Sequence, residues 1–254
     1  MKLYKLYFSP TGGTKKVADI VGRAWNNEME EIDLSDTNIN FKDYIFKEED
    51  ICLVAVPSFG GRVPAIAVER LKKITGGNAK AIILTVYGNR AYEDTLLELK
   101  DTLKNSEFQC VAAIAGIAEH SIMHQFGANR PDSSDEKELE EFGEKVKILL
   151  EQNETLSDIK VPGNSPYKEY NGVPFKPQVG GKCTKCGQCV VKCPVKAISK
   201  KDPTKMEKSK CISCMRCIAV CPQHARVLNK VVLFAASQKM NKACSIRKSN
   251  ELFI

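Results

Sequence analysis

The chain alternates between short apolar runs and longer segments in which apolar residues recur at helical spacing. ICLVAV at 51–56 and AKAIILTVY at 79–87 are nearly continuous apolar runs, as in strands buried on both faces of a sheet. Other segments place apolar residues three and four positions apart, as amphipathic helices do. The pattern predicts strands at 3–8, 30–34, 51–56, 79–87 and 110–118, and helices at 14–26, 64–74, 92–104 and 134–152.

The alternation of five strands with four helices predicts an α/β fold with a doubly wound, five-stranded parallel sheet. Ligands of such sheets bind at the carboxyl ends of the strands. We therefore expect the binding residues in the loops that follow the first, third and fourth strands.

The loop after the first strand reads SPTGGT at 9–14. Its small residues allow successive N–H groups and a helix N-terminus to point at one anion, and Ser9, Thr11 and Thr14 add hydroxyl groups. The order of residues excludes a Walker loop, and the G-x-G-x-x-G fingerprint of dinucleotide-binding folds is absent. A hydroxyl-rich anion-binding loop and a plain glycine-rich turn both remain open.

Composition and charge divide the chain in two. Residues 1–158 hold 19 Lys+Arg and 27 Asp+Glu, a net charge of −8, whereas residues 159–254 hold 19 and 4, a net charge of +15. No apolar run is long enough to cross a membrane, and the N-terminus lacks the features of a signal peptide, so we expect a cytoplasmic protein. The predicted units are a first domain at 1–155, a proline- and glycine-containing linker at 156–180, a second domain at 181–230 and a C-terminal tail at 231–254.

The strongest motif is a cysteine pattern that occurs twice. CTKCGQCVVKCP at 183–194 and CISCMRCIAVCP at 211–222 both read C-x2-C-x2-C-x3-C-P, with an offset of 28 residues. Zinc ribbons use paired C-x2-C motifs without this ending, and disulfides are rare in cytosolic proteins. Cys52 and Cys110 lie in predicted buried strands, and we expect them and Cys244 to have no part in the motif.

The repeated motif resembles that of bacterial-type ferredoxins with two 4Fe–4S clusters, in which the fourth cysteine of each run serves the other cluster. The resemblance implies a small α+β ferredoxin-like domain with two cluster sites. One site would consist of Cys183, Cys186, Cys189 and Cys221, and the other of Cys211, Cys214, Cys217 and Cys193.

Residues 1–152 resemble a flavodoxin, because SPTGGT matches the S/T-x-T-G-x-T phosphate loop and PSFGGRVP and YGNRAY follow the third and fourth strands. The resemblance implies bound FMN, with Phe59 and Tyr92 stacked on its ring and a peptide flip at Gly60-Gly61 on reduction. The implied FMN-binding residues are Ser9, Thr11, Gly12, Gly13, Thr14, Ser58, Phe59, Gly60, Gly61, Tyr87, Gly88, Asn89, Arg90 and Tyr92.

Two features depart from an ordinary flavodoxin. Arg62 and Arg90 lie in loops that are commonly acidic, and an arginine that faced the flavin would raise its reduction potential. The lysine-rich second domain can raise the cluster potentials, bind an acidic redox partner or bind the acidic first domain. Nucleic-acid binding is disfavoured, because no recognition motif or aromatic interleaving accompanies the lysines.

Taken together, the whole chain resembles a flavodoxin–ferredoxin fusion, which implies electron transfer between FMN, two 4Fe–4S clusters and redox partner proteins, in an anaerobe. A flavin-dependent reductase of NAD(P)H, a quinone or another small substrate is the alternative, with His120 and His124 in the 118–131 loop as possible proton donors. A redox sensor is a third possibility. The basic tail is either a docking segment or frayed.

Overall fold

The computed structural model describes residues 2–26, 28–152 and 158–254. Its central sheet has the strand order β2-β1-β3-β4-β5-β8, in which the first five strands are parallel. This confirms the predicted parallel sheet, and its order is that of the flavodoxin-like doubly wound fold. The strands are β1 (Leu3–Tyr7), β2 (Glu30–Asp33), β3 (Ile51–Pro57), β4 (Lys80–Tyr87), β5 (Gln109–Ile117) and β8 (Glu251–Phe253).

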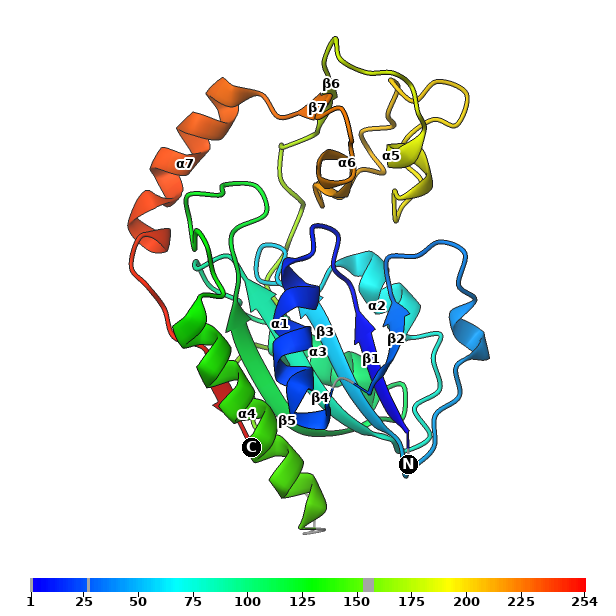
Figure 1. Cartoon of the computed structure of the whole chain (residues 1–254), viewed down its shortest axis with the longest axis vertical. Coiled ribbons are helices and arrows are strands. Elements are labelled where there is room, and N and C mark those ends of the chain that lie inside the picture. The colour runs from blue at the N-terminus through cyan, green and yellow to red at the C-terminus, as the bar shows by residue number, and fades with distance from the viewer. Residues whose placement is uncertain (1, 27, 153–157) are drawn as a thin grey trace.

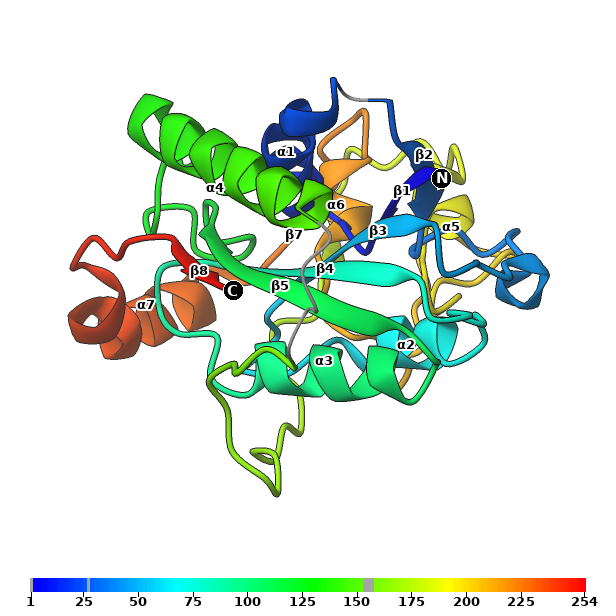
Figure 2. The same cartoon turned by 90° about the horizontal axis from the view of Figure 1, so that it is seen from below.

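Helices cover both faces of the sheet (Figure 2). The helices α1 (Gly13–Gly22) and α4 (Ser133–Glu151) pack on one face, and α2 (Ala65–Leu71) and α3 (Thr95–Lys104) pack on the other. The apolar runs of β3 and β4 are buried because each face contributes to a separate hydrophobic core. The helix predicted at 14–26 ends earlier, at Gly22, and continues as the 3₁₀ helix η1 (Arg23–Trp25); a second 3₁₀ helix, η2 (Phe41–Asp43), follows β2.

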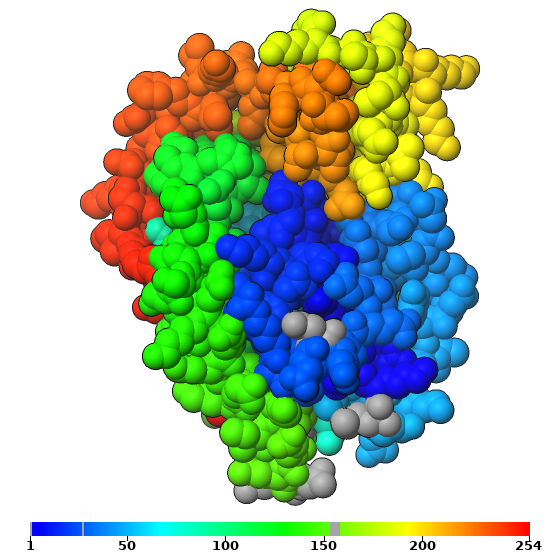
Figure 3. All heavy atoms as spheres, viewed as in Figure 1, coloured from blue at the N-terminus to red at the C-terminus, as the bar shows by residue number. Residues whose placement is uncertain are grey.

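The cysteine-rich region lies above the carboxyl ends of the parallel strands (Figure 1). It consists mainly of loops, with two four-residue helices, α5 (Gln188–Val191) and α6 (Arg216–Ala219), and a two-stranded antiparallel sheet of β6 (Gln178–Val179) and β7 (Arg226–Val227). The space-filling view shows this region, in yellow and orange, in contact with the blue N-terminal loop below it (Figure 3). We refer to residues 181–229 as the cluster region.

The basic tail is folded. It forms α7 (Lys230–Cys244) and then β8, which pairs antiparallel with β5 as an unpredicted sixth strand. Arg247 forms an ion pair with Asp132 at 2.7 Å, and the buried Asn250 side chain accepts a hydrogen bond from the Ile117 N–H at 3.0 Å. The tail therefore docks on the acidic half of its own chain, and it is not frayed.

Within the residues that the structure describes, no helix has the length and apolar character needed to cross a membrane.

Candidate functional site

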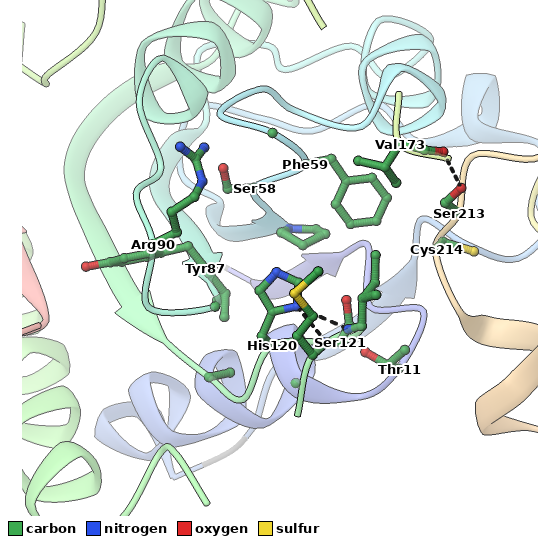
Figure 4. A pocket seen from close by; sticks show the side chains of 18 of the residues that line it. Thr11, Ser58, Phe59, Tyr87, Arg90, His120, Ser121, Val173, Ser213 and Cys214 are labelled. Atoms are coloured by element: carbon green, nitrogen blue, oxygen red, sulfur yellow. Dashed lines mark hydrogen bonds between the residues drawn. The ribbon is translucent and has the colours of Figure 1, made fainter. Parts of the chain in front are cut away.

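A cavity of about 330 Å³ opens at the carboxyl ends of the parallel strands. Its walls come from the loops after β1, β3, β4 and β5, from the segment that precedes the cluster region, and from the cluster region itself (Figure 4). Of the predicted FMN-binding residues, the loops contribute Thr11, Gly13, Thr14, Ser58, Phe59, Gly60, Tyr87, Gly88 and Arg90. We call this space the strand-end cavity.

The loop after β1 forms a turn whose N–H groups precede a helix. Gly12 has a φ of 95°, a left-handed conformation that favours glycine, and is the N-cap of α1. The buried Ser9 hydroxyl accepts a hydrogen bond from the Lys15 N–H at 2.9 Å, which satisfies one of the free N–H groups in the first turn of α1. Thr11, Gly13 and Thr14 line the cavity at the helix N-terminus, where an anion is favoured.

The loop after β3 places Phe59 in the cavity, where its ring points toward the interior (Figure 4). Gly60 and Gly61 have φ values of 62° and 90°. A Cβ atom at Gly60 would lie 2.4 Å from the Tyr170 ring, and one at Gly61 would lie 1.9 Å from a Glu93 carboxylate oxygen. Both glycines are therefore required by backbone conformation and by close packing.

The loop after β4 differs from the prediction at two residues. Tyr92, predicted to stack on a flavin ring, is buried outside the cavity, where its hydroxyl donates to Glu251 at 3.0 Å and its ring packs edge-on against Tyr87. Asn89 is also buried outside the cavity, and its amide donates to the Cys244 carbonyl at 2.6 Å. Both side chains anchor the C-terminal tail, which the sequence pattern did not reveal.

The two loop arginines are both ion-paired. Arg62 forms two hydrogen bonds to Glu98, at 2.8 and 2.7 Å, and does not line the strand-end cavity. Arg90 lines the cavity and is paired with Glu93 at 2.9 Å. Arg62 therefore brings no uncompensated charge to the cavity, whereas Glu93 also pairs with Lys168 at 2.8 Å, so that two cavity-lining cations share one carboxylate.

His120, in the loop after β5, accepts hydrogen bonds at Nδ1 and is thereby held in one tautomer. Its ring lies in the cavity (Figure 4), and Nδ1 accepts hydrogen bonds from the N–H groups of Ile122 and Met123, both at 3.1 Å. An imidazole that accepts at Nδ1 carries its proton at Nε2. Burial lowers the pKa of His120 to about 4, so the ring is neutral at pH 7 and can offer its Nε2–H as a hydrogen-bond donor but is not charged to release a proton. His124 is exposed and pairs with Glu119 at 2.6 Å.

We expect the His120 imidazole to titrate near pH 4 and to be in the Nε2–H tautomer at pH 7. Two-bond ¹H–¹⁵N NMR spectra of the cofactor-free chain measure both. Since the unfolded imidazole gains a proton below a pKa of about 6.5, the folded state loses stability as the pH falls from there toward 4. His120→Gln is expected to lessen that loss. A titration of His120 near pH 6.5 would contradict this assignment.

The lid of the cavity was not predictable from the loop motifs. Tyr170, Val173 and Phe175 come from the predicted linker, and Met240 comes from α7. The only signal in the sequence was the presence of two aromatic residues in YNGVPF, at 170–175, which are unusual in a flexible linker.

The eight motif cysteines gather in two groups. Cys183, Cys186, Cys189 and Cys221 line one small cavity, and Cys193, Cys211, Cys214 and Cys217 line another. The fourth cysteine of each motif thus lies with the first three of the other motif, as the ferredoxin resemblance implies. No compact group of three or more His, Cys, Asp or Glu side chains suited to a single metal ion occurs among the described residues. The cysteines surround a space instead of converging on a point.

The two motifs share one backbone conformation. Lys185, Gly187 and Lys196 have positive φ values, and so do Ser213, Met215 and His224, each 28 residues later. The N–H of Ala197 donates to Cys193 Sγ at 3.3 Å, and the N–H of Ala225 donates to Cys221 Sγ at 3.2 Å. N–H groups directed at cysteine sulfur stabilise thiolates, the form that binds iron–sulfur clusters.

Two buried guanidinium atoms also fit an anionic group in these cavities. Arg226 Nη1 and Arg216 Nε are buried and have no hydrogen-bond partner among the described residues. Arg226 lines the cavity of Cys183, and Arg216 lines that of Cys214. A 4Fe–4S cluster with four thiolates is an anion, so the residues present fit the groups that the motif implies.

The strand-end cavity and the second cysteine cavity share a wall. Cys214 lines both, and its neighbour Ser213, which donates to the Val173 carbonyl at 3.3 Å, also lines the strand-end cavity (Figure 4). None of the four cysteines of the first cavity lines the strand-end cavity.

Residues 182–225 match the family model of the 4Fe-4S dicluster domain. The chain joins a flavodoxin-like fold to a region that matches the 4Fe-4S dicluster domain. The match spans both cysteine motifs in full. No curated protein matches the sequence of the chain.

Several solved structures are similar to part of the chain. A Streptococcus pneumonia TIGR4 flavodoxin is 17% identical, with a TM-score of 0.42 over 59% of this chain and 99% of that one. Flavodoxin 1 from Bacillus cereus is 16% identical, with a TM-score of 0.43 over 58% and 98%. Rubredoxin oxygen:oxidoreductase from Desulfovibrio gigas is 13% identical, with a TM-score of 0.43 over 59% of this chain and only 36% of that one. The flavodoxin-like fold is established by the strand order.

Proposed function

We propose that the protein carries electrons between an FMN at the strand-end cavity and two 4Fe–4S clusters, and passes them on to redox partner proteins. The observation that carries this proposal is the shared wall, because Cys214 borders both the strand-end cavity and the second cysteine cavity. Groups bound in these two cavities would both border Cys214. Such proximity suits direct electron exchange.

When bound, a flavin exchanges one or two electrons and each 4Fe–4S cluster exchanges one. Thr11, Gly13 and Thr14 would bind the FMN phosphate at the N-terminus of α1. Phe59 and the lid residue Tyr170 would exclude water from the flavin ring. FMN is favoured over a dinucleotide because the chain has one anion-binding loop and no dinucleotide fingerprint.

An anaerobic reduction experiment tests the proposal. Protein with its clusters and flavin intact would be mixed with NADH, then NADPH, then a low-potential chemical reductant, while flavin and cluster absorbance are followed together. We expect only the low-potential reductant to act at a rate that supports turnover, and we expect flavin and clusters to be reduced in linked steps.

Rapid bleaching by a pyridine nucleotide would overturn the carrier proposal and favour a flavin-dependent reductase. Reduction of the flavin without any change in the clusters would also contradict it, since the proposal requires exchange across the wall formed by Cys214.

Gly60→Ala is expected to weaken FMN binding at least about tenfold, because the added methyl group would meet the Tyr170 ring at 2.4 Å and displace it from the wall of the cavity. Gly172→Ala is the matched control: its φ is 82°, but the position of its Cβ has no atom within 4 Å and it does not line the cavity. We expect a change of less than about twofold there. Fluorescence titration with FMN measures both, and equal affinities in the two variants would contradict the proposed loop role.

A further inference from the structure

The internal repeat makes the two cluster cavities comparable residue by residue. Ala197-Ile198 in the first motif corresponds to Ala225-Arg226 in the second, at the same offset of 28 residues. The side chains at these positions are equally buried, with 4% of Ile198 and 3% of Arg226 exposed. Ile198 lines the cavity of Cys193, Cys211, Cys214 and Cys217, and Arg226 lines the cavity of Cys183, Cys186, Cys189 and Cys221. One cavity thus carries a buried cation where the other carries an alkyl group.

Arg226 has no counter-ion among the described residues. Its Nη2 donates to the Pro203 carbonyl, its Nη1 has no partner, and it forms no ion pair in the part of the chain that the structure covers. A buried guanidinium without an anion is costly unless a ligand supplies the negative charge. Arg216, at the other cavity, differs because it is paired with Asp33 at 3.5 Å.

We propose that Arg226 is the counter-ion of the cluster held by Cys183, Cys186, Cys189 and Cys221, and that it gives this cluster the higher reduction potential of the two. The inference rests on the proposed function. Reduction adds one negative charge to a cluster, and an adjacent buried cation stabilises the reduced form. Ile198 provides no such charge inside the other cavity, and Asp33 offsets that of Arg216. The Lys176 ammonium donates to the Cys211 carbonyl, and the Arg226 charge opposes the effect of burial on the pKa of Cys217, but neither side chain lines that cavity.

The difference in potential sets the order of electron flow. The cluster beside Cys214 borders the strand-end cavity, whereas the cluster beside Arg226 is bound partly by Cys186, which is exposed. One electron that leaves the cluster beside Cys214 and enters the cluster beside Arg226 moves toward the higher potential. Arg226 therefore directs electrons from the flavin side to the surface at Cys186, where Lys182 and Lys185 are also exposed.

The test is Arg226→Ile in the complete protein, which gives this position the side chain of its repeat partner. EPR-monitored potentiometric titration measures the midpoints of both clusters. We expect the higher midpoint to fall, so that the equilibrium constant for one-electron transfer between the clusters drops at least tenfold, or about 59 mV. Lys192→Met, an exposed lysine outside both cysteine cavities, is the control and is expected to change neither midpoint detectably.

Two further variants separate charge from folding. Arg226→Lys retains the charge, and we expect it to keep most of the difference between the two midpoint potentials. Arg226→Gln retains a hydrogen-bond donor without the charge, and we expect it to lose that difference. If Arg226→Ile lowers the iron content, the comparison of the lysine and glutamine variants provides the test instead. Unchanged midpoints in the isoleucine or glutamine variant, or an equal fall of both, would overturn the inference. Failure of the proposed function would instead be seen in the unaltered protein, as absent clusters or as flavin and clusters that do not exchange electrons.

Discussion

Cys193→Ser is expected to remove the cluster bound by Cys211, Cys214 and Cys217, although Cys193 belongs to the first motif. In the structure the Cys193 side chain is buried with those three cysteines, and Cys221 lies with the other three. Loss of one 4Fe–4S cluster would lower the iron content from about eight to about four atoms per chain. Iron and sulfide analysis after anaerobic purification measures the change.

The cluster lost in Cys193→Ser is the one that borders the strand-end cavity. We therefore expect flavin and the remaining cluster to exchange electrons at least about tenfold more slowly, corresponding to a rise in the barrier of roughly 1.4 kcal/mol. Cys221→Ser is expected to lower the iron content equally but to leave exchange between the flavin and its neighbouring cluster fast. Cys244→Ser is the control, because Cys244 is buried outside both cysteine cavities. If Cys221→Ser rather than Cys193→Ser uncouples the flavin, the crossed arrangement is wrong.

Truncation after Ser249 is expected to lower the thermal unfolding midpoint by about 10 °C, because removal of Asn250 and β8 leaves buried groups without partners. The Ile117 N–H loses the Asn250 side chain, and Glu138 loses its 2.6 Å hydrogen bond to the same amide. The main-chain pairing of residues 113–115 with β8 is lost as well. At about 1 kcal/mol or more for each such group, the loss amounts to roughly 4 kcal/mol.

Deletion of Ile254 alone is the matched control, since this residue is 65% exposed and lies beyond β8. We expect its unfolding midpoint to match that of the intact chain. Because a protein with bound clusters unfolds irreversibly, both truncations should be compared at one scan rate. A truncation after Ser249 that melts with the intact chain would show that the end of the tail contributes nothing to stability.

The sheet was predictable because its signals are local. A buried strand such as 79–87 is recognisable from its own apolar run, and the cysteine sets follow from short spacings and a 28-residue repeat. The sixth strand was not predictable, because ELF is three residues long and its partner in β5 lies more than 130 residues earlier along the chain. A strand that short is specified by its partner rather than by its own sequence.

The error at Tyr92 has the same origin. Its position in the loop after β4 matches that of a stacking aromatic, but Glu251 of the tail holds its hydroxyl and Tyr87 covers its ring. The aromatic residue that does cover the cavity beside Gly60 is Tyr170, from a segment with no periodic pattern. Which of two aromatic residues faces a cavity is decided by contacts between distant segments, and a single sequence does not display them.

The return of the tail to β5 changes how the chain is organised. In the order of the polypeptide the cluster region is an insertion between α4 and β8, and it is tethered to one α/β body at both ends. A region with two tethers does not swing about a single hinge, so the proposed electron exchange across the Cys214 wall would need no docking step. During synthesis the sheet gains its last strand only after all eight cysteines have been made, so completion of the sheet follows the appearance of both cluster sites.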